Sequence, residues 1–196
     1  MNRLKWGWVV GAIALLSLGV DGAEALPGDR AESVLAWIKA NPTLRSGAGD
    51  GFIVRRENTP AQRFRFQASV LAPGRITVPT NPGVIRSEQF EIVDRINGVP
   101  PQRLEESLRA IYGLDIYEDY IRSSIVYDYP NRDTLELARR QNLPSLGAQR
   151  GQLRSGRRFA YWTEITYSQD GQPLNGRVTV LLKEDLDKLA AELRDR

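Results

Sequence analysis

The clearest pattern in the chain is a strict alternation of apolar and polar residues between positions 63 and 70. Phenylalanine, alanine and valine occupy the even positions, whereas arginine, glutamine and serine occupy the odd ones. Successive side chains of a strand point to opposite faces, so this period of two predicts a strand that is buried on one face only. Half-buried strands of this kind are typical of antiparallel sheets.

Other segments predict the remaining strands of such a sheet. Short apolar or alternating runs, bounded by glycine, proline or asparagine, indicate five further strands. These runs lie at 52–56, 89–96, 123–129, 158–168 and 177–183. The last two are predicted to form a hairpin. The polar segment at about 144–157 predicts a long basic loop.

Helical periodicity predicts helices before, between and after these strands. A capping box of Asp29 and Glu32 predicts the start of the first helix, Gly113 is predicted to end a middle helix, and Asp133 to cap a later one. The helices are expected at 31–40, 101–112, 115–122, 134–141 and 184–194. Because strands and helices do not alternate regularly, we predict a single α+β domain. It should have a mainly antiparallel sheet of about six strands, an N-terminal helix, middle helices and a C-terminal helix.

The first 25 residues have the pattern of an export signal. Two basic residues precede an apolar run over 6–20, and Ala23-Glu24-Ala25 offers small residues at the positions that signal peptidases recognise. We predict a signal peptide over 1–25, cleaved after Ala25, and a globular domain over 26–196. The alternative is an uncleaved anchor, although a helix over this run covers only about 22 Å of a ~30 Å hydrocarbon core. The expected location is the periplasm or the exterior, or a thylakoid lumen if the organism is photosynthetic.

The chain contains no histidine and no cysteine, which removes several kinds of chemistry. Without histidine there is no usual general base at neutral pH and no imidazole metal ligand, and without cysteine there is no thiolate nucleophile or thiolate metal ligand. We therefore predict no catalytic residue, no cofactor and no metal site. The formal net charge of +3 is too small to indicate a nucleic-acid partner.

Two segments of opposite character are candidates for binding partners. Residues 112–129 hold five of the seven tyrosines with four acids and one arginine, and stiff, amphipathic tyrosines often anchor protein partners. Residues 139–158 hold six arginines and no acid, which favours anionic lipid headgroups, anionic glycan or an acidic protein. The candidate partner-binding residues are Arg139, Arg140, Arg150, Arg154, Arg157, Arg158, Tyr117, Tyr120 and Asp119.

These patterns predict an exported, non-enzymatic accessory or interaction protein of the bacterial envelope, with no membrane span after signal removal. Two alternatives remain open. One is a small glycan hydrolase in which Glu164, on the same strand face as Trp162, works with Asp119 or Asp128 as the second carboxylate. The other is a sheet that holds a small apolar ligand in a pocket lined by the phenylalanines of the 63–70 strand (Phe64 and Phe66) or by Trp162.

Overall fold

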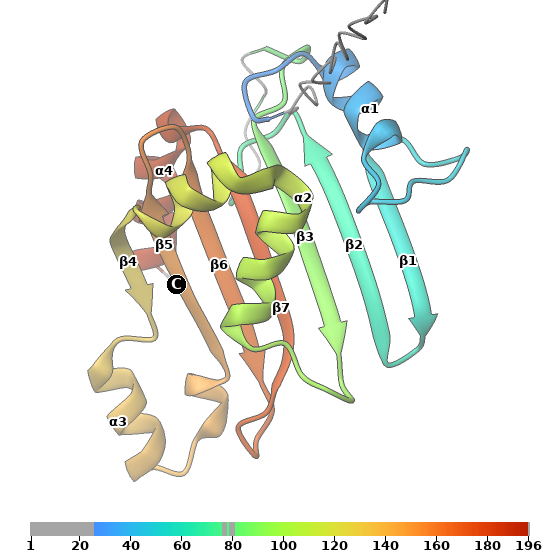
Figure 1. Cartoon of the computed structure of the whole chain (residues 1–196). Coiled ribbons are helices and arrows are strands. Elements are labelled where there is room, and N and C mark those ends of the chain that lie inside the picture. The colour runs from blue at the N-terminus through green and yellow to red at the C-terminus, as the bar shows by residue number, and fades with distance from the viewer. Residues whose placement is uncertain (1–25, 76–77, 79–80, 196) are drawn as a thin grey trace, which may run out of the picture.

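Seven strands form one antiparallel sheet in this computed structural model, which describes residues 26–75, 78 and 81–195. The predicted signal segment 1–25 lies outside the described residues. The strands are β1 (Ile53–Thr59), β2 (Gln62–Ser69), β3 (Ser87–Asp94), β4 (Ser124–Tyr129), β5 (Gln149–Ser155), β6 (Ala160–Tyr167) and β7 (Pro173–Leu181). Their order across the sheet is β1-β2-β3-β7-β6-β5-β4 (Figure 1). The predicted α+β class is confirmed, with seven strands instead of about six.

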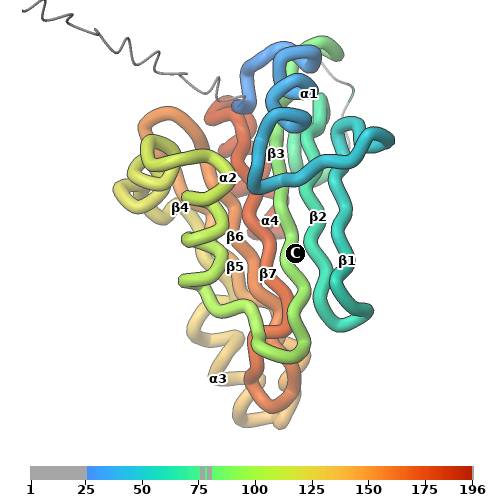
Figure 2. The backbone as a smooth tube through the Cα atoms, turned by 45° about the vertical axis from the view of Figure 1, so that its right-hand side comes forward, coloured from blue at the N-terminus to red at the C-terminus, as the bar shows by residue number. Residues whose placement is uncertain are grey.

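The helices lie on both faces of this sheet and at one end of it. In Figures 1 and 2, α1 (Ala31–Ala40) and α2 (Pro101–Ile121) cover one face, and α4 (Leu186–Arg194) lies on the opposite face. The remaining helix, α3 (Arg132–Arg140), extends beyond the end of the sheet. Two short 3₁₀ segments, Pro144–Gly147 and Lys183–Asp185, complete the described elements. None of the helices in the described ranges is long and apolar enough to cross a bilayer.

Each face of the sheet has its own hydrophobic core. The face under α1 and α2, here called the α1/α2 face, holds the larger one, which includes Val34, Ile38, Val54, Phe66, Phe90, Leu108, Tyr112, Tyr161 and Val178. The opposite face, here called the α4 face, holds a smaller core of Leu153, Ala160, Trp162 and Leu181 beneath Leu186, Leu189, Ala190 and Leu193. The buried strand residues of this second core come from β5, β6 and β7, and Val126, Tyr127 and Tyr129 of β4 pack against them, so α4 covers only that half of the face.

The predicted loop at about 144–157 is wrong over most of its length, because Gln149–Ser155 forms strand β5. β5 pairs with β4 on one side and β6 on the other, so both edges of its backbone are hydrogen-bonded. Its only apolar side chain, Leu153, is fully buried in the α4-face core. Pairing with the two neighbouring strands therefore makes this segment a strand, although its polar composition predicts a loop.

Helix ends also differ from the sequence prediction. Asp29 does not cap α1, because its carboxylate accepts a hydrogen bond from the backbone N–H of Leu26 at 2.9 Å, and the N-cap is Arg30. Asn131, two residues before the predicted Asp133, caps α3. The predicted break at Gly113 is present as a kink inside α2, where φ is +82°, a backbone conformation that glycine adopts without a steric penalty.

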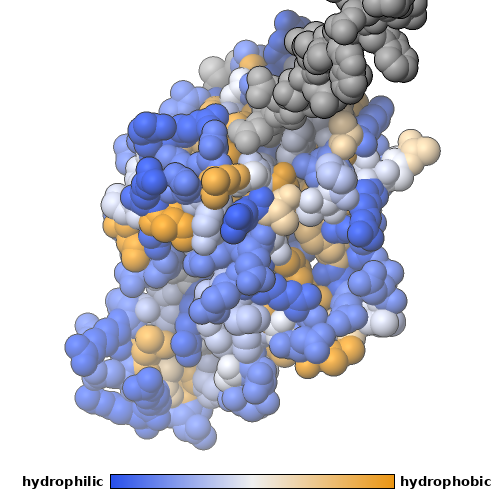
Figure 3. Space-filling model, in the orientation of Figure 1, coloured by the Kyte–Doolittle hydropathy of each residue, from blue (hydrophilic) through white to orange (hydrophobic). Residues whose placement is uncertain are grey.

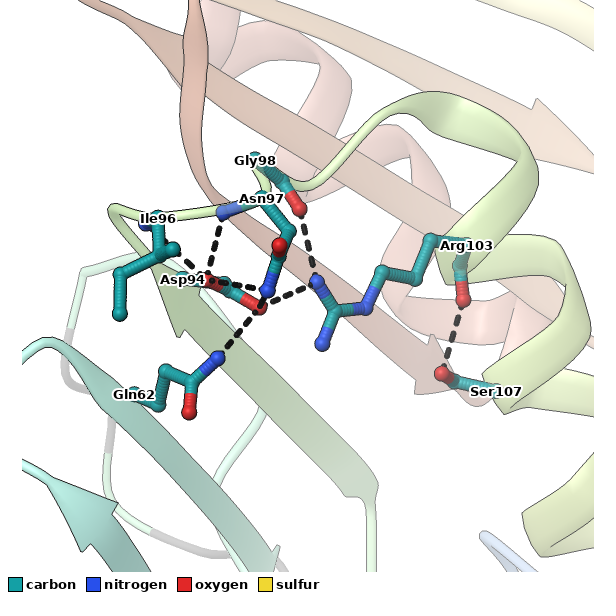
Figure 4. A network of polar contacts seen from close by, with 7 residues as sticks. All are labelled: Gln62, Asp94, Ile96, Asn97, Gly98, Arg103 and Ser107. Atoms are coloured by element: carbon teal, nitrogen blue, oxygen red, sulfur yellow. Dashed lines mark hydrogen bonds and ion pairs between the residues drawn. The ribbon is translucent and has the colours of Figure 1, made fainter.

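A buried carboxylate closes the connection from β3 to α2 (Figure 4). Asp94 accepts hydrogen bonds from the backbone N–H groups of Ile96 at 3.1 Å and Asn97 at 2.9 Å, and from the Arg103 guanidinium at 2.7 Å. Burial alone would raise the pKa of Asp94, but these bonds outweigh it and hold the pKa well below its ordinary value. The turn that aims α2 across the sheet is thereby fixed.

Candidate functional site

Asp119, predicted on an acidic tyrosine-bearing surface, lies in the interior. Its carboxylate accepts hydrogen bonds from the backbone N–H groups of Arg157 at 2.8 Å and Phe159 at 3.3 Å, and from the Tyr161 hydroxyl at 2.7 Å. Burial alone would raise the pKa of Asp119, but these bonds lower it below the ordinary value. Asp119 therefore holds the turn between β5 and β6 and is not presented to a partner.

Two neighbours of Asp119 are also built into the fold. Tyr120 is buried, and its ring packs edge-to-face on Tyr161 at a centroid distance of 5.4 Å. Arg154 lies 5.3 Å from the centre of the Tyr120 ring, and its guanidinium donates to the Ser123 hydroxyl and carbonyl oxygens at 2.8 and 2.9 Å. Tyr117, the other candidate tyrosine, is partly exposed. The structure thus buries Asp119 and Tyr120 and leaves Tyr117 partly accessible.

The predicted arginine-rich surface is divided between the two ends of β5. Arg139 and Arg140 are exposed on α3, and Arg150 lies near them at the start of β5, stacked 4.4 Å from the centre of the Tyr167 ring. Arg157 and Arg158 are exposed at the turn after β5. A seven-residue strand spans about 20 Å, so the two groups cannot act as one loop.

The most extensive polar network on the α4 face surrounds Glu164, whose side chain is 4% exposed. The carboxylate forms an ion pair with Arg177 and accepts hydrogen bonds from the Tyr129 hydroxyl and from the Gln149 amide, the latter at 2.9 Å. The indole N–H of Trp162 donates to the Tyr129 hydroxyl at 2.8 Å. Burial and these three direct partners fix the orientation of the carboxylate, and Trp162 holds Tyr129 in place.

This network depends on a glycine between its two outer members. The strand register places Gly151 of β5 between Tyr129 of β4 and Glu164 of β6. A Cβ atom at Gly151 would overlap the Tyr129 ring. The tyrosine therefore reaches Glu164 by lying flat across β5, and no local sequence pattern signals this contact.

The two acids considered as hydrolytic partners of Glu164 lie on the other side of the sheet. Asp119 contacts Tyr161, a residue of the α1/α2-face core. Asp128 aligns with Thr163, whose side chain points away from the face that holds Glu164 because successive strand residues alternate. A glycosidase needs two carboxylates facing one sugar, and this sheet separates them. Over the described ranges, no group of three or more acidic side chains could hold a metal ion.

The side of the molecule that carries α1 and α2 is mostly hydrophilic, with separate hydrophobic patches (Figure 3). On the opposite side, a cavity of about 510 Å³ lies where α4 leaves the sheet uncovered. The sheet, the loop after β2 and α4 all contribute to it. Its polar and aromatic lining consists of Gln67, Ser69, Arg75, Ser87, Gln89, Trp162, Arg177, Thr179 and Glu192.

The strand register brings the floor of this cavity together from four strands. Gln67, Gln89, Thr179 and Trp162 form one row across β2, β3, β7 and β6. Arg177, one row below, lies 4.6 Å from the centre of the Trp162 ring and pairs with Glu164. Its side chain is 30% exposed, so a charged donor held in a fixed position borders the cavity.

Sequence reasoning selected Trp162 and Glu164 but missed the other residues of this site. The alternation over 63–70 identifies a polar strand face, whereas only the register shows that polar faces of three more strands continue it. Comparison with protein families, with curated proteins and with solved structures finds no match for this chain. The functional argument therefore rests on the geometry of the α4 face.

Proposed function

We propose that this chain is a non-enzymatic binding protein whose ligand occupies the cavity on the α4 face. The observation that carries the proposal is the convergence of fixed polar groups from four strands around a cavity of about 510 Å³. Small-ligand sites commonly have volumes of about 300–1,000 Å³. Of the alternatives drawn from the sequence, this corresponds to the ligand-binding sheet, with a polar ligand in place of an apolar one.

The lining indicates the chemistry of the ligand. Two amides (Gln67 and Gln89) and three hydroxyls (Ser69, Ser87 and Thr179) can donate and accept hydrogen bonds. Two arginines (Arg75 and Arg177) against one acid (Glu192) give the lining an excess of positive charge. An apolar ligand would strip water from these groups without replacing its hydrogen bonds, at about 1–3 kcal/mol for each group left unpaired. A hydroxylated molecule with one carboxylate, such as a sugar acid, matches both the neutral groups and the excess of positive charge, while Arg177 stays paired with Glu164.

We further propose that this binding takes place in the bacterial envelope, where the partner would be a glycan component or another envelope molecule. The export-type pattern of residues 1–25 supports this location. A chain without histidine and cysteine is also better suited to binding than to most hydrolytic or redox chemistry.

Calorimetric titration of the full chain with glucuronate, glucose and a short-chain alcohol tests the proposed ligand class. Glucuronate should bind most tightly, and Gln89→Met should weaken that binding about three- to tenfold by removing a hydrogen-bonding amide. Gln152→Met is the matched control, because Gln152 is a half-buried strand glutamine on the α1/α2 face. Tightest binding of the alcohol, or equal losses in the two variants, would contradict the proposal.

A further inference from the structure

Three arginines lie side by side on the uncovered half of the α4 face. Arg55 of β1 is directly opposite Arg65 of β2, and Arg63 follows two residues along β2 on the same face. Directly opposed cross-strand residues have Cβ atoms about 4.5–5.5 Å apart, and alternate residues of a strand are about 7 Å apart. The three guanidinium groups therefore extend from one small area, here called the arginine cluster.

The cluster is only partly neutralised within the fold. Glu57 and Glu91 face Arg63 and Arg65 across the strands. Neither acid comes within ion-pair distance of them, and no acid in the described ranges pairs with Arg55. Arg55 and Arg65 are like charges directly opposite each other, which is unfavourable in a sheet. The three positive charges therefore outnumber the two acids that face them.

Other arginines of the chain form close ion pairs with buried acids and so have a structural role. Arg86 pairs with Asp185 at 2.8 Å, and Arg103 pairs with Asp94 at 2.7 Å. Arg65 differs from both: one of its terminal nitrogens donates to the Gln67 amide oxygen at 2.6 Å, while its Nε is buried without a hydrogen-bond partner. A guanidinium has five N–H donors, so Arg65 keeps further donors for an acceptor besides the one bonded to Gln67.

The space beside the cluster can accept such a ligand. A cavity of about 420 Å³ borders Arg55, Arg63 and Arg65, and Glu57 of β1 and Glu91 and Val93 of β3 also line it. Gln67, which accepts from Arg65, also lines the cavity near Trp162. The arginine cluster and that cavity are therefore neighbours on one open sheet face.

We propose that the arginine cluster is a binding site for a linear anionic polysaccharide, with Arg55, Arg63 and Arg65 each contacting a sulfate or carboxylate group. Guanidinium groups pair with such oxyanions through two parallel hydrogen bonds, which favours these groups over neutral sugars. A nucleic acid is a poorer fit, because the α4-face positions of β1, β2 and β3 carry no aromatic side chain on which a base could stack. The site does not depend on what occupies the cavity near Trp162.

The test compares two variants of the full chain that lose the same charge. One replaces Arg55, Arg63 and Arg65 with Gln, and the control replaces the exposed Arg30, Arg109 and Arg132 with Gln. Fluorescence anisotropy then measures binding of labelled heparin, which carries sulfate, and of labelled polygalacturonate, which carries carboxylate. Circular dichroism checks that both variants keep the fold, which we expect because the first substitution removes repulsion.

The cluster variant should lose at least tenfold in affinity for one or both polysaccharides, and the control variant less than twofold. The polysaccharide that loses more identifies the preferred anionic group. Equal losses in the two variants would show that net charge alone drives binding, and would overturn the proposal. Absence of binding by the unmodified chain, or tighter binding of a single-stranded oligonucleotide, would overturn it as well.

Discussion

The two faces of this sheet use the same strands for different purposes. On the α1/α2 face, Phe66 and Phe90 are fully buried beneath helices. Their chain neighbours Gln67 and Gln89 point to the α4 face, where they line an open cavity. A single residue step along a strand thus changes a side chain from core to candidate ligand contact. The comparison predicts that substitutions on the two faces will affect stability and ligand binding separately.

The largest expected effect on stability comes from truncating a core side chain on the α1/α2 face. Phe66→Ala should lower the free energy of unfolding by about 3–5 kcal/mol, because it leaves a cavity in a close-packed core. Gln67→Ala, one residue along β2, should change it by no more than about 0.5 kcal/mol. Urea denaturation of the two variants measures both values. Similar losses would show that the α4 face is also part of the stability core.

A buried acid on the covered face should make stability depend on pH. Glu88 is fully buried, and burial raises its pKa from an ordinary value of 4.5 to about 8, although the nearby Tyr112 hydroxyl opposes part of the shift. Between these two values the folded state binds a proton that the unfolded state has lost. The free energy of unfolding should therefore fall by up to about 1.4 kcal/mol per pH unit from about pH 4.5 to about pH 8, and level off above.

Glu88→Gln tests this assignment, because an amide keeps the shape of the protonated acid and does not titrate in this range. Denaturation at several pH values between 5 and 9 should show a flatter dependence for the variant than for the unmodified chain. Parallel curves would assign the pH dependence to other groups.

The third effect concerns the part of the α4 face that holds the network of Tyr129 and Glu164. Gly151→Ala should destabilise the chain by about 1–3 kcal/mol, because the new methyl group displaces Tyr129 from Glu164. In a Tyr129→Ala background the same substitution should cost much less, since the overlapping ring is gone. A double-mutant cycle by thermal denaturation measures this difference, and additive effects would exclude the proposed overlap.

The smallest expected effect comes from a substitution in the arginine cluster, on the open half of the α4 face. Arg55→Thr removes one of two directly opposed arginines and places a residue with high strand propensity on β1. Stability should rise by about 0.2–1 kcal/mol, while binding of an anionic polysaccharide should weaken. Chemical denaturation and anisotropy on the same sample check both. A loss of stability would show that Arg55 has a structural role.

The sequence predicts the covered face much better than the open one. The alternation over 63–70 identifies β2 and its buried face because that signal is local. β5 was missed because pairing with β4 and β6, distant in sequence, makes it a strand despite its polar residues. The candidate site was missed for the same reason: Arg55 and Arg65, or Gln67 and Thr179, become neighbours only through strand register.

The burial of two predicted site residues has a different cause. Asp119 and Tyr120 follow one another in a segment rich in acids and tyrosines, and such a composition resembles that of an exposed binding surface. The kink at Gly113 redirects α2, and the second part of the helix carries both residues, which are buried. Their burial therefore depends on where the helix is placed, which composition does not reveal.

Side-chain NMR of a chain labelled with ¹⁵N-arginine tests most directly whether the open half of the α4 face binds ligand while the α1/α2 face serves only as a core. Addition of the polysaccharide that binds best should shift the Nε–H signals of Arg55, Arg63 and Arg65. The signals of Arg103 and Arg154, which are bonded within the fold outside the open half of the α4 face, should stay in place. Shifts confined to Arg103, Arg154 and the exposed arginines of α3 would contradict the account.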